Sequence, residues 1–85
     1  MARFELHFKS SVAKDLRRIP NRDVRRILDR IELLADTPRP PGAVKLSGQE
    51  RYRLRVGIYR ILYEVHDATV VVVVVTVGHR RDVYR

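Results

Sequence analysis

Apolar residues along the chain follow a two-residue period at its beginning and a helical period in the segment after it. Residues 3–8 alternate strictly between apolar and polar positions, which predicts a half-buried strand. A first helix is expected to begin at Ser10 or Ser11 and to end before Pro20, since the residue before proline resists the helical conformation. Its apolar positions are spaced four and three residues apart: Val12, Leu16 and Ile19.

A second helix is predicted from Asn21, which is expected to act as its N-terminal cap. This segment has the strongest helical periodicity of the chain. Residues 37–49 are rich in proline and glycine and predict a connector, with Val44 and Leu46 as its contacts to the core. The apolar positions of the second helix are Val24, Ile27, Leu28, Ile31, Leu34 and Ala35.

Three further strands are predicted at about 50–56, 59–66 and 69–77. Valine fills every position of 70–75, and β-branched residues favour strand over helix. A strand without alternation is expected to be buried on both faces, so this one should lie inside the sheet.

Gly57 is expected to begin a two-residue hairpin turn, because glycine suits the first central position of a type II′ turn. The resulting register places Leu54 opposite Ile61 and Arg55 opposite Arg60. Like charges directly opposite each other destabilise a strand pair by roughly 0.2–1 kcal/mol. Folding does not require this arrangement, whereas binding an anion does.

The predicted fold is α+β, with the order β-α-α-β-β-β in a single domain spanning residues 1–85. An antiparallel four-stranded sheet should carry a two-helix hairpin packed on one face. The other face should then display the arginines of the first hairpin, which are Arg51, Arg53, Arg55 and Arg60.

The charge of the chain indicates a binding function in addition to the fold. The chain has 18 Lys and Arg against 10 Asp and Glu, a net charge of +8, and arginine accounts for most of the cations. Arginine binds phosphate in a bidentate manner and stacks on bases, so the expected partner is a polyanion, most simply nucleic acid, or a strongly acidic protein.

The lack of cysteine fits a reducing cytoplasm and excludes a thiolate metal site. We also expect no signal peptide and no membrane association, because the longest apolar run is far shorter than a membrane span. No metal-ligand spacing and no phosphate-binding glycine loop is present, so neither a metal nor another cofactor is expected.

Candidate catalytic and RNA-binding residues follow directly after Gly78, where the valine strand ends. Strict strand alternation directs His79 toward the arginine side, but a break at Gly78 directs Arg80 there instead. The pattern alone leaves both possibilities open. Arg81 and Tyr84 follow directly, and Arg81 is expected, with Arg51 and Arg53, to bind RNA.

Two segments, "YRLRVGIYRILYEV" and "VVVVTVGHRRDVYR", together with the order of elements, resemble the RelE/ParE toxins of type II toxin–antitoxin systems. Ribonucleases of that family cut messenger RNA on the ribosome by attack of the ribose 2′-hydroxyl on the adjacent phosphate. The resemblance assigns phosphate-site roles by position to basic strand residues and to the C-terminus. These positions are Arg53, Arg55, Arg60, Arg80 and Tyr84.

Elementary chemistry is consistent with this assignment. Guanidinium groups at Arg60 and Arg80 can stabilise a phosphorane, while Arg55 contributes positive potential. Tyr84 can stack on a base or transfer a proton. Arginine is a poor general base and His79 is a better one, so the sequence leaves the identity of the general base open.

The resemblance implies a toxin acting as a ribosome-dependent mRNA endonuclease that needs no metal. Its expected partners are a cognate antitoxin, the ribosome and mRNA. Two alternatives stay open, namely a ParE-like DNA gyrase poison and a non-catalytic RNA-binding module.

Overall fold

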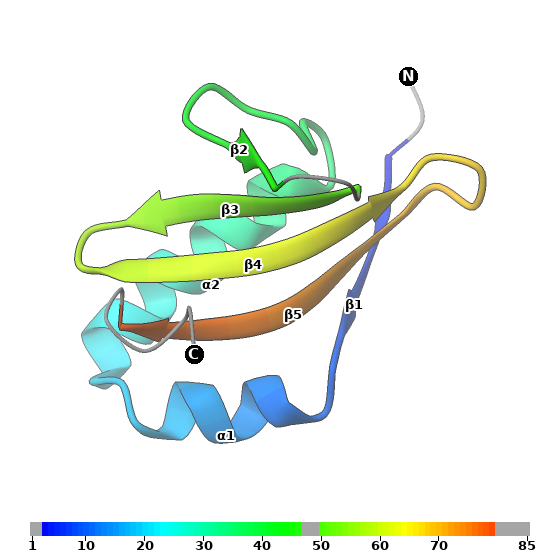
Figure 1. Cartoon of the computed structure of the whole chain (residues 1–85). Coiled ribbons are helices and arrows are strands. Elements are labelled where there is room, and N and C mark those ends of the chain that lie inside the picture. The colour runs from blue at the N-terminus through cyan, green and yellow to red at the C-terminus, as the bar shows by residue number, and fades with distance from the viewer. Residues whose placement is uncertain (1–2, 47–49, 80–85) are drawn as a thin grey trace.

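The helices and strands follow the predicted order, with one additional short strand (Figure 1). The computed structural model describes residues 3–46 and 50–79, so the predictions for Arg80, Arg81 and Tyr84 lie outside the described residues. The elements are β1 (Glu5–Phe8), α1 (Ser11–Arg17), α2 (Asn21–Leu34), β2 (Val44–Lys45), β3 (Arg51–Val56), β4 (Tyr59–His66) and β5 (Val71–His79).

The sheet has five strands in the order β1-β5-β4-β3-β2, which corrects two details of the predicted α+β fold. β1 runs parallel to β5, so the sheet is mixed and not wholly antiparallel. A parallel pair needs a long connection, and here all the intervening elements supply it. The fifth strand, β2, forms inside the predicted connector by pairing with β3.

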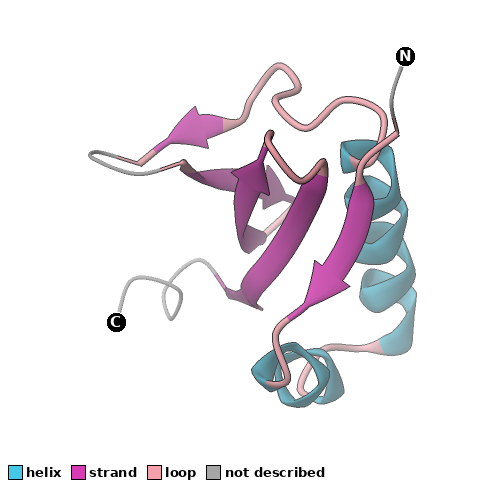
Figure 2. Ribbon diagram, turned by 90° about the vertical axis from the view of Figure 1, so that its right-hand side faces the viewer, coloured by secondary structure: helices cyan, strands magenta, loops and turns pink. Residues whose placement is uncertain are grey.

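Both helices pack against the sheet, and among residues 3–46 and 50–79 no helix lies over its other face (Figure 2). α1 contacts β5, and α2 contacts β3. The hydrophobic core lies between helices and sheet, as the periodicity predicted. Its buried side chains are Val12, Ile19, Ile27, Ile31, Leu34, Tyr52, Leu54, Val56, Ile61, Tyr63, Val65, Val72, Val74 and Val77.

β5 lies inside the sheet between β1 and β4, as its sequence predicted. The prediction that both its faces are buried is wrong, because helices cover only one of them. Val72 and Val74 are buried on that side, whereas Val71 and Val73 are half-buried on the other. The strand also begins later than predicted, since Val70 has a φ of 57°, outside the extended region.

The helices begin slightly differently from the prediction. Asn21 is the first residue of α2 and not its cap; Pro20 precedes the helix, and its carbonyl accepts hydrogen bonds from the amides of Asp23 and Val24. Ser10 does precede α1, but its side chain makes no capping hydrogen bond. Proline's fixed φ suits the entry to a helix, which accounts for the displaced start.

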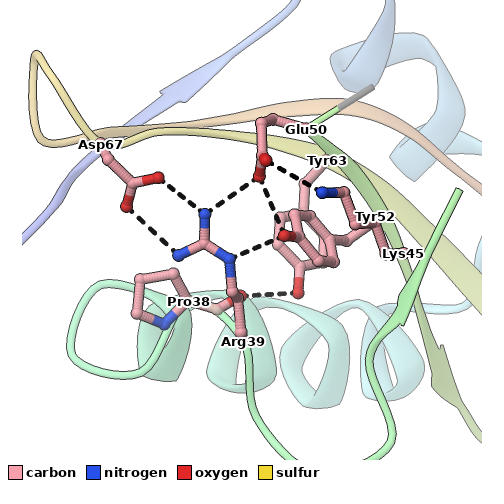
Figure 3. Close-up of polar contacts among 7 residues, drawn as sticks. All are labelled: Pro38, Arg39, Lys45, Glu50, Tyr52, Tyr63 and Asp67. Atoms are coloured by element: carbon pink, nitrogen blue, oxygen red, sulfur yellow. Dashed lines mark hydrogen bonds and ion pairs between the residues drawn. The ribbon is translucent and has the colours of Figure 1, made fainter. Parts of the chain in front are cut away.

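A polar cluster holds the connector against the sheet (Figure 3). The guanidinium of Arg39 donates to the Tyr52 hydroxyl at 2.7 Å, to Asp67 at 2.7 Å and to Glu50 at 3.1 Å. Lys45 also donates to Glu50 at 3.0 Å. By contrast Val44, expected as an apolar contact of the connector, is 44% exposed.

This cluster predicts a specific loss of stability in acid. Hydrogen bonds from Lys45, then from Arg39 and Tyr52, lower the pKa of Glu50 from its ordinary 4.5 to about 2. A carboxylate with a depressed folded-state pKa stabilises the fold above its unfolded pKa and loses that contribution as the pH falls through the folded one. Glu50→Gln is therefore expected to reduce the dependence of unfolding midpoint on pH between 4.5 and about 2.

Urea unfolding across that pH range measures the effect. Asp29→Asn, which alters an exposed carboxylate of α2, is the matched control and should leave the pH dependence unchanged. A Glu50→Gln curve parallel to the parent's would contradict a role of this carboxylate in acid stability.

Candidate functional site

The face of the sheet opposite the helices carries the arginines in ordered rows across neighbouring strands. At the end near the hairpin turn, Arg55 is directly opposite Arg60, and Arg60 is directly opposite Gly78. The register predicted from the turn is therefore confirmed, including the juxtaposed arginines. We call the row of Arg55, Arg60 and Gly78 the arginine row.

The turn beside the arginine row requires its glycine. Gly57 has a φ of 60°, in the left-handed region that favours glycine, as expected for the start of a tight hairpin turn. Arg55 is exposed and Arg60 is half-buried. Because Gly78 has no side chain, no side chain projects from the β5 position next to Arg60.

The next row contains Arg53, which is half-buried and lies opposite Leu62. Leu62 in turn lies opposite Thr76, and Val44 flanks Arg53 on the other side. The residues paired along this row, Val44, Leu62 and Thr76, are uncharged, and the aliphatic stem of Arg53 can cover apolar surface there.

Arg51 lies at the far end of the face and is held by an acidic residue. Its guanidinium donates to Glu64 at 2.7 Å, and His66 contacts the same carboxylate at 3.0 Å. Hydrogen bonds from Arg51 and then His66 lower the pKa of Glu64, so the carboxylate stays ionised. The charge of Arg51 is consequently compensated by Glu64.

His79 lies on the helix side of the sheet, opposite Tyr59, and not on the arginine side. The two rings meet edge to face with their centroids 6.4 Å apart. The cause is a register shift between Leu62 and Tyr63, whose partners on β5 are Thr76 and Val74. One extra residue, Val75, thus reverses the alternation before the strand reaches Gly78.

Strict alternation therefore gave the wrong side for His79. The break in alternation that the sequence left open does occur, but at Val75 and not at Gly78. Such a bulge has no signature in a run of identical valines, so the pattern could not locate it.

A cavity of about 360 Å³ lies on the helix side, at the end of β4 and β5. Its lining includes Asp15, Arg18, Tyr59 and His79. The Tyr59 hydroxyl donates to Asp23 at 2.9 Å, and this bond raises the pKa of Tyr59. The cavity also reaches Gly78, a member of the arginine row, near the end of β5.

Sequence reasoning missed Asp15, whose carboxylate accepts a hydrogen bond from the Val77 amide at 3.1 Å. A signal was present, because Asp15 lies three residues after Val12 and four before Ile19, within the apolar stripe of the helix. An acidic residue on a stripe that faces the sheet indicates a polar partner there.

Residues 3–46 and 50–79 contain no group of three or more potential ligand side chains arranged to hold a metal ion. In that same part of the chain, neither helix has the length and apolar character needed to cross a membrane.

The sequence and fold match characterised toxins. A family model described as the ParE toxin of the type II toxin–antitoxin system parDE matches residues 6–84. Toxin RelG of Mycobacterium tuberculosis (strain ATCC 25618 / H37Rv) is 30% identical over 88 residues, covering 96% of this chain and 97% of that protein.

Two solved structures show the same architecture. The archaeal RelE–RelB complex from Pyrococcus horikoshii OT3 contains a chain with a TM-score of 0.79 and 25% identity, covering 93% of this chain and 97% of that one. The isolated RelE toxin of E. coli has a TM-score of 0.78 and 28% identity, covering 95% and 90% respectively. The chain therefore belongs to the RelE/ParE superfamily and is a RelE-like toxin of a type II toxin–antitoxin system.

Proposed function

We propose that this toxin is a ribosome-dependent mRNA endonuclease and that the arginine row binds the scissile phosphate. The observation that carries the proposal is the direct opposition of Arg55 and Arg60 beside Gly78. Like charges directly opposite each other lower the stability of a strand pair, and an anion bound by both side chains offsets that cost. A phosphate accepts bidentate hydrogen bonds from such groups.

In this scheme the ribose 2′-hydroxyl attacks the adjacent phosphorus, the bond to the 5′-oxygen of the next nucleotide breaks, and a cyclic phosphate remains. Negative charge develops on the phosphorane oxygens, where preorganised guanidiniums of Arg60 and Arg80 stabilise it. Arg55 adds positive potential, and Arg53 and Arg81 bind the flanking RNA backbone. No metal is needed, because cationic side chains neutralise the developing charge.

Proton transfer in this scheme is assigned to Tyr84 and not to His79. The His79 ring contacts Tyr59 on the helix side, and the sheet lies between it and the arginine row. Arg51 contributes less to RNA binding in this scheme, because its charge is compensated by Glu64.

A cognate antitoxin is the proposed protein partner. Solved relatives with this fold include toxin–antitoxin complexes, among them those from Pyrococcus horikoshii OT3 and Methanococcus jannaschii. The net charge of +8 indicates that such a partner is acidic where it covers the sheet. The ribosome and mRNA are the proposed targets once the antitoxin is removed.

Inducing the chain alone in cells and mapping messenger RNA ends tests the function. We expect new 5′ ends on translated messages within minutes, and none on the same messages when a mutated start codon prevents their translation. RNA binding without new ends would instead indicate a non-catalytic RNA-binding module.

One observation favours a second candidate, a DNA gyrase poison, because the matching family model is described as a ParE toxin. This candidate predicts altered plasmid supercoiling and intact messages after induction. Measuring both readouts in the same culture separates the two functions.

A further inference from the structure

β5 extends past the end of the strand beside it. The last β1 partner is Phe8, opposite Val74, and the Lys9 amide donates to the Val74 carbonyl at 2.9 Å. Beyond that point residues 75–79 of β5 have no strand on this side, within the described part of the chain. α1 lies along this edge of β5 instead (Figure 1).

The bulge at Val75 lies in this same stretch. After it, Val77 is opposite Ile61 and is buried in the core, and Gly78 is opposite Arg60. A ladder without the bulge, continued from the pair of Tyr63 and Val74, places Val77 opposite Arg60 instead. One extra residue in β5 therefore decides which side chain lies next to the arginine row.

Asp15 contacts the strand just after the bulge. Its half-buried carboxylate accepts the Val77 amide hydrogen at 3.1 Å, taking the place of the carbonyl that a neighbouring strand supplies elsewhere. A hydrogen bond to an ionised acceptor is about twice as strong as one between neutral groups. This bond forms only when Val77 directs its amide toward α1.

We propose that Asp15 is a positioning residue, which holds the bulged register of β5 and thereby keeps Gly78 opposite Arg60 and His79 on the helix side. Only the expected effect of this register on catalysis rests on the proposed function. With Val77 in place of Gly78, an isopropyl group stands beside the Arg60 guanidinium and obstructs the space assigned to the scissile phosphate.

Nuclear magnetic resonance on the labelled, purified toxin tests the register directly. In Asp15→Ala we expect hydrogen exchange of the Val77 amide to rise about tenfold to a hundredfold, the range for losing a hydrogen bond to a charged group. The nuclear Overhauser contact between the Tyr59 and His79 rings should weaken. Exchange at Val72, which lies beside β1, should not change.

Two further variants separate positioning from general stability. Asp15→Asn retains an acceptor without the charge, and we expect it to raise Val77 exchange by about threefold to tenfold, half the effect of Asp15→Ala on a free-energy scale. This variant decides the question if Asp15→Ala does not fold. Asp29→Ala removes an exposed carboxylate from α2 and should leave Val77 exchange unchanged.

The same samples are assayed for cleavage of a translated message on ribosomes. We expect Asp15→Ala to lose at least tenfold in cleavage and Asp15→Asn to retain most of it. Unchanged Val77 exchange and an unchanged ring contact in Asp15→Ala would overturn the positioning role. A changed register with full cleavage would overturn its link to catalysis, whereas a parent without cleavage refutes the proposed function and leaves the register result standing.

Discussion

Replacing Arg60 by alanine is expected to lower mRNA cleavage on the ribosome by about a hundredfold to a thousandfold, the range for removing one preorganised donor to a developing oxyanion. Arg60 lies between Arg55 and Gly78 at the centre of the arginine row. Removing it also relieves the like-charge opposition with Arg55. Urea unfolding of the variant, measured beside its activity, separates a loss of chemistry from a loss of fold. Growth after induction and cleavage by purified protein both measure the effect.

Arg25→Ala is the matched control for this substitution. Arg25 is exposed on α2, so the variant has the same loss of charge without any change in the arginine row. We expect it to remain toxic, apart from a small general decrease in affinity for RNA. If Arg60→Ala cuts RNA as fast as Arg25→Ala, the arginine row is not the site of phosphate chemistry.

Tyr63→Ala is expected to destabilise the fold by about 3–5 kcal/mol, as for other large aromatic residues truncated in a core. Tyr63 has no exposed surface, stacks on Tyr52 with centroids 5.7 Å apart, and donates its hydroxyl to the Pro38 carbonyl at 2.7 Å. Because small domains have only about 5–15 kcal/mol of stability, this loss removes a large share of it. Urea unfolding followed by circular dichroism measures it.

Tyr63→Phe isolates the hydroxyl from the ring. It keeps the stacking on Tyr52 and removes only the bond to Pro38, so a loss of about 1–2 kcal/mol is expected. Equal destabilisation by both substitutions would show that the ring contributes little, contrary to its burial.

Much of the fold could be predicted because periodic patterns report which face of an element is buried. Apolar positions spaced four and three residues apart located α1 and α2. The turn at Gly57 set the register that brings Arg55 opposite Arg60. Those features depend on residues close together in the sequence. The opposition of Arg55 and Arg60 was therefore predictable before any tertiary contact was known.

Other features depend on contacts between segments far apart in the chain. The parallel pairing of β1 with β5 and the Arg39 cluster join residues whose separation leaves no local pattern. The side of the sheet on which His79 lies is another case, since it follows from a bulge within a run of valines.

The sequence by itself determined the element order, the helix-covered face and the arginine-bearing face, because side-chain periodicity is a local property of helices and strands. Only the tertiary structure decided that Gly78 stands beside Arg60 and that His79 does not. The difference follows from strand register, because one extra residue moves every following side chain of the strand to the other face of the sheet. The bulge that sets it lies where α1 borders β5, with the Val77 amide hydrogen-bonded to Asp15.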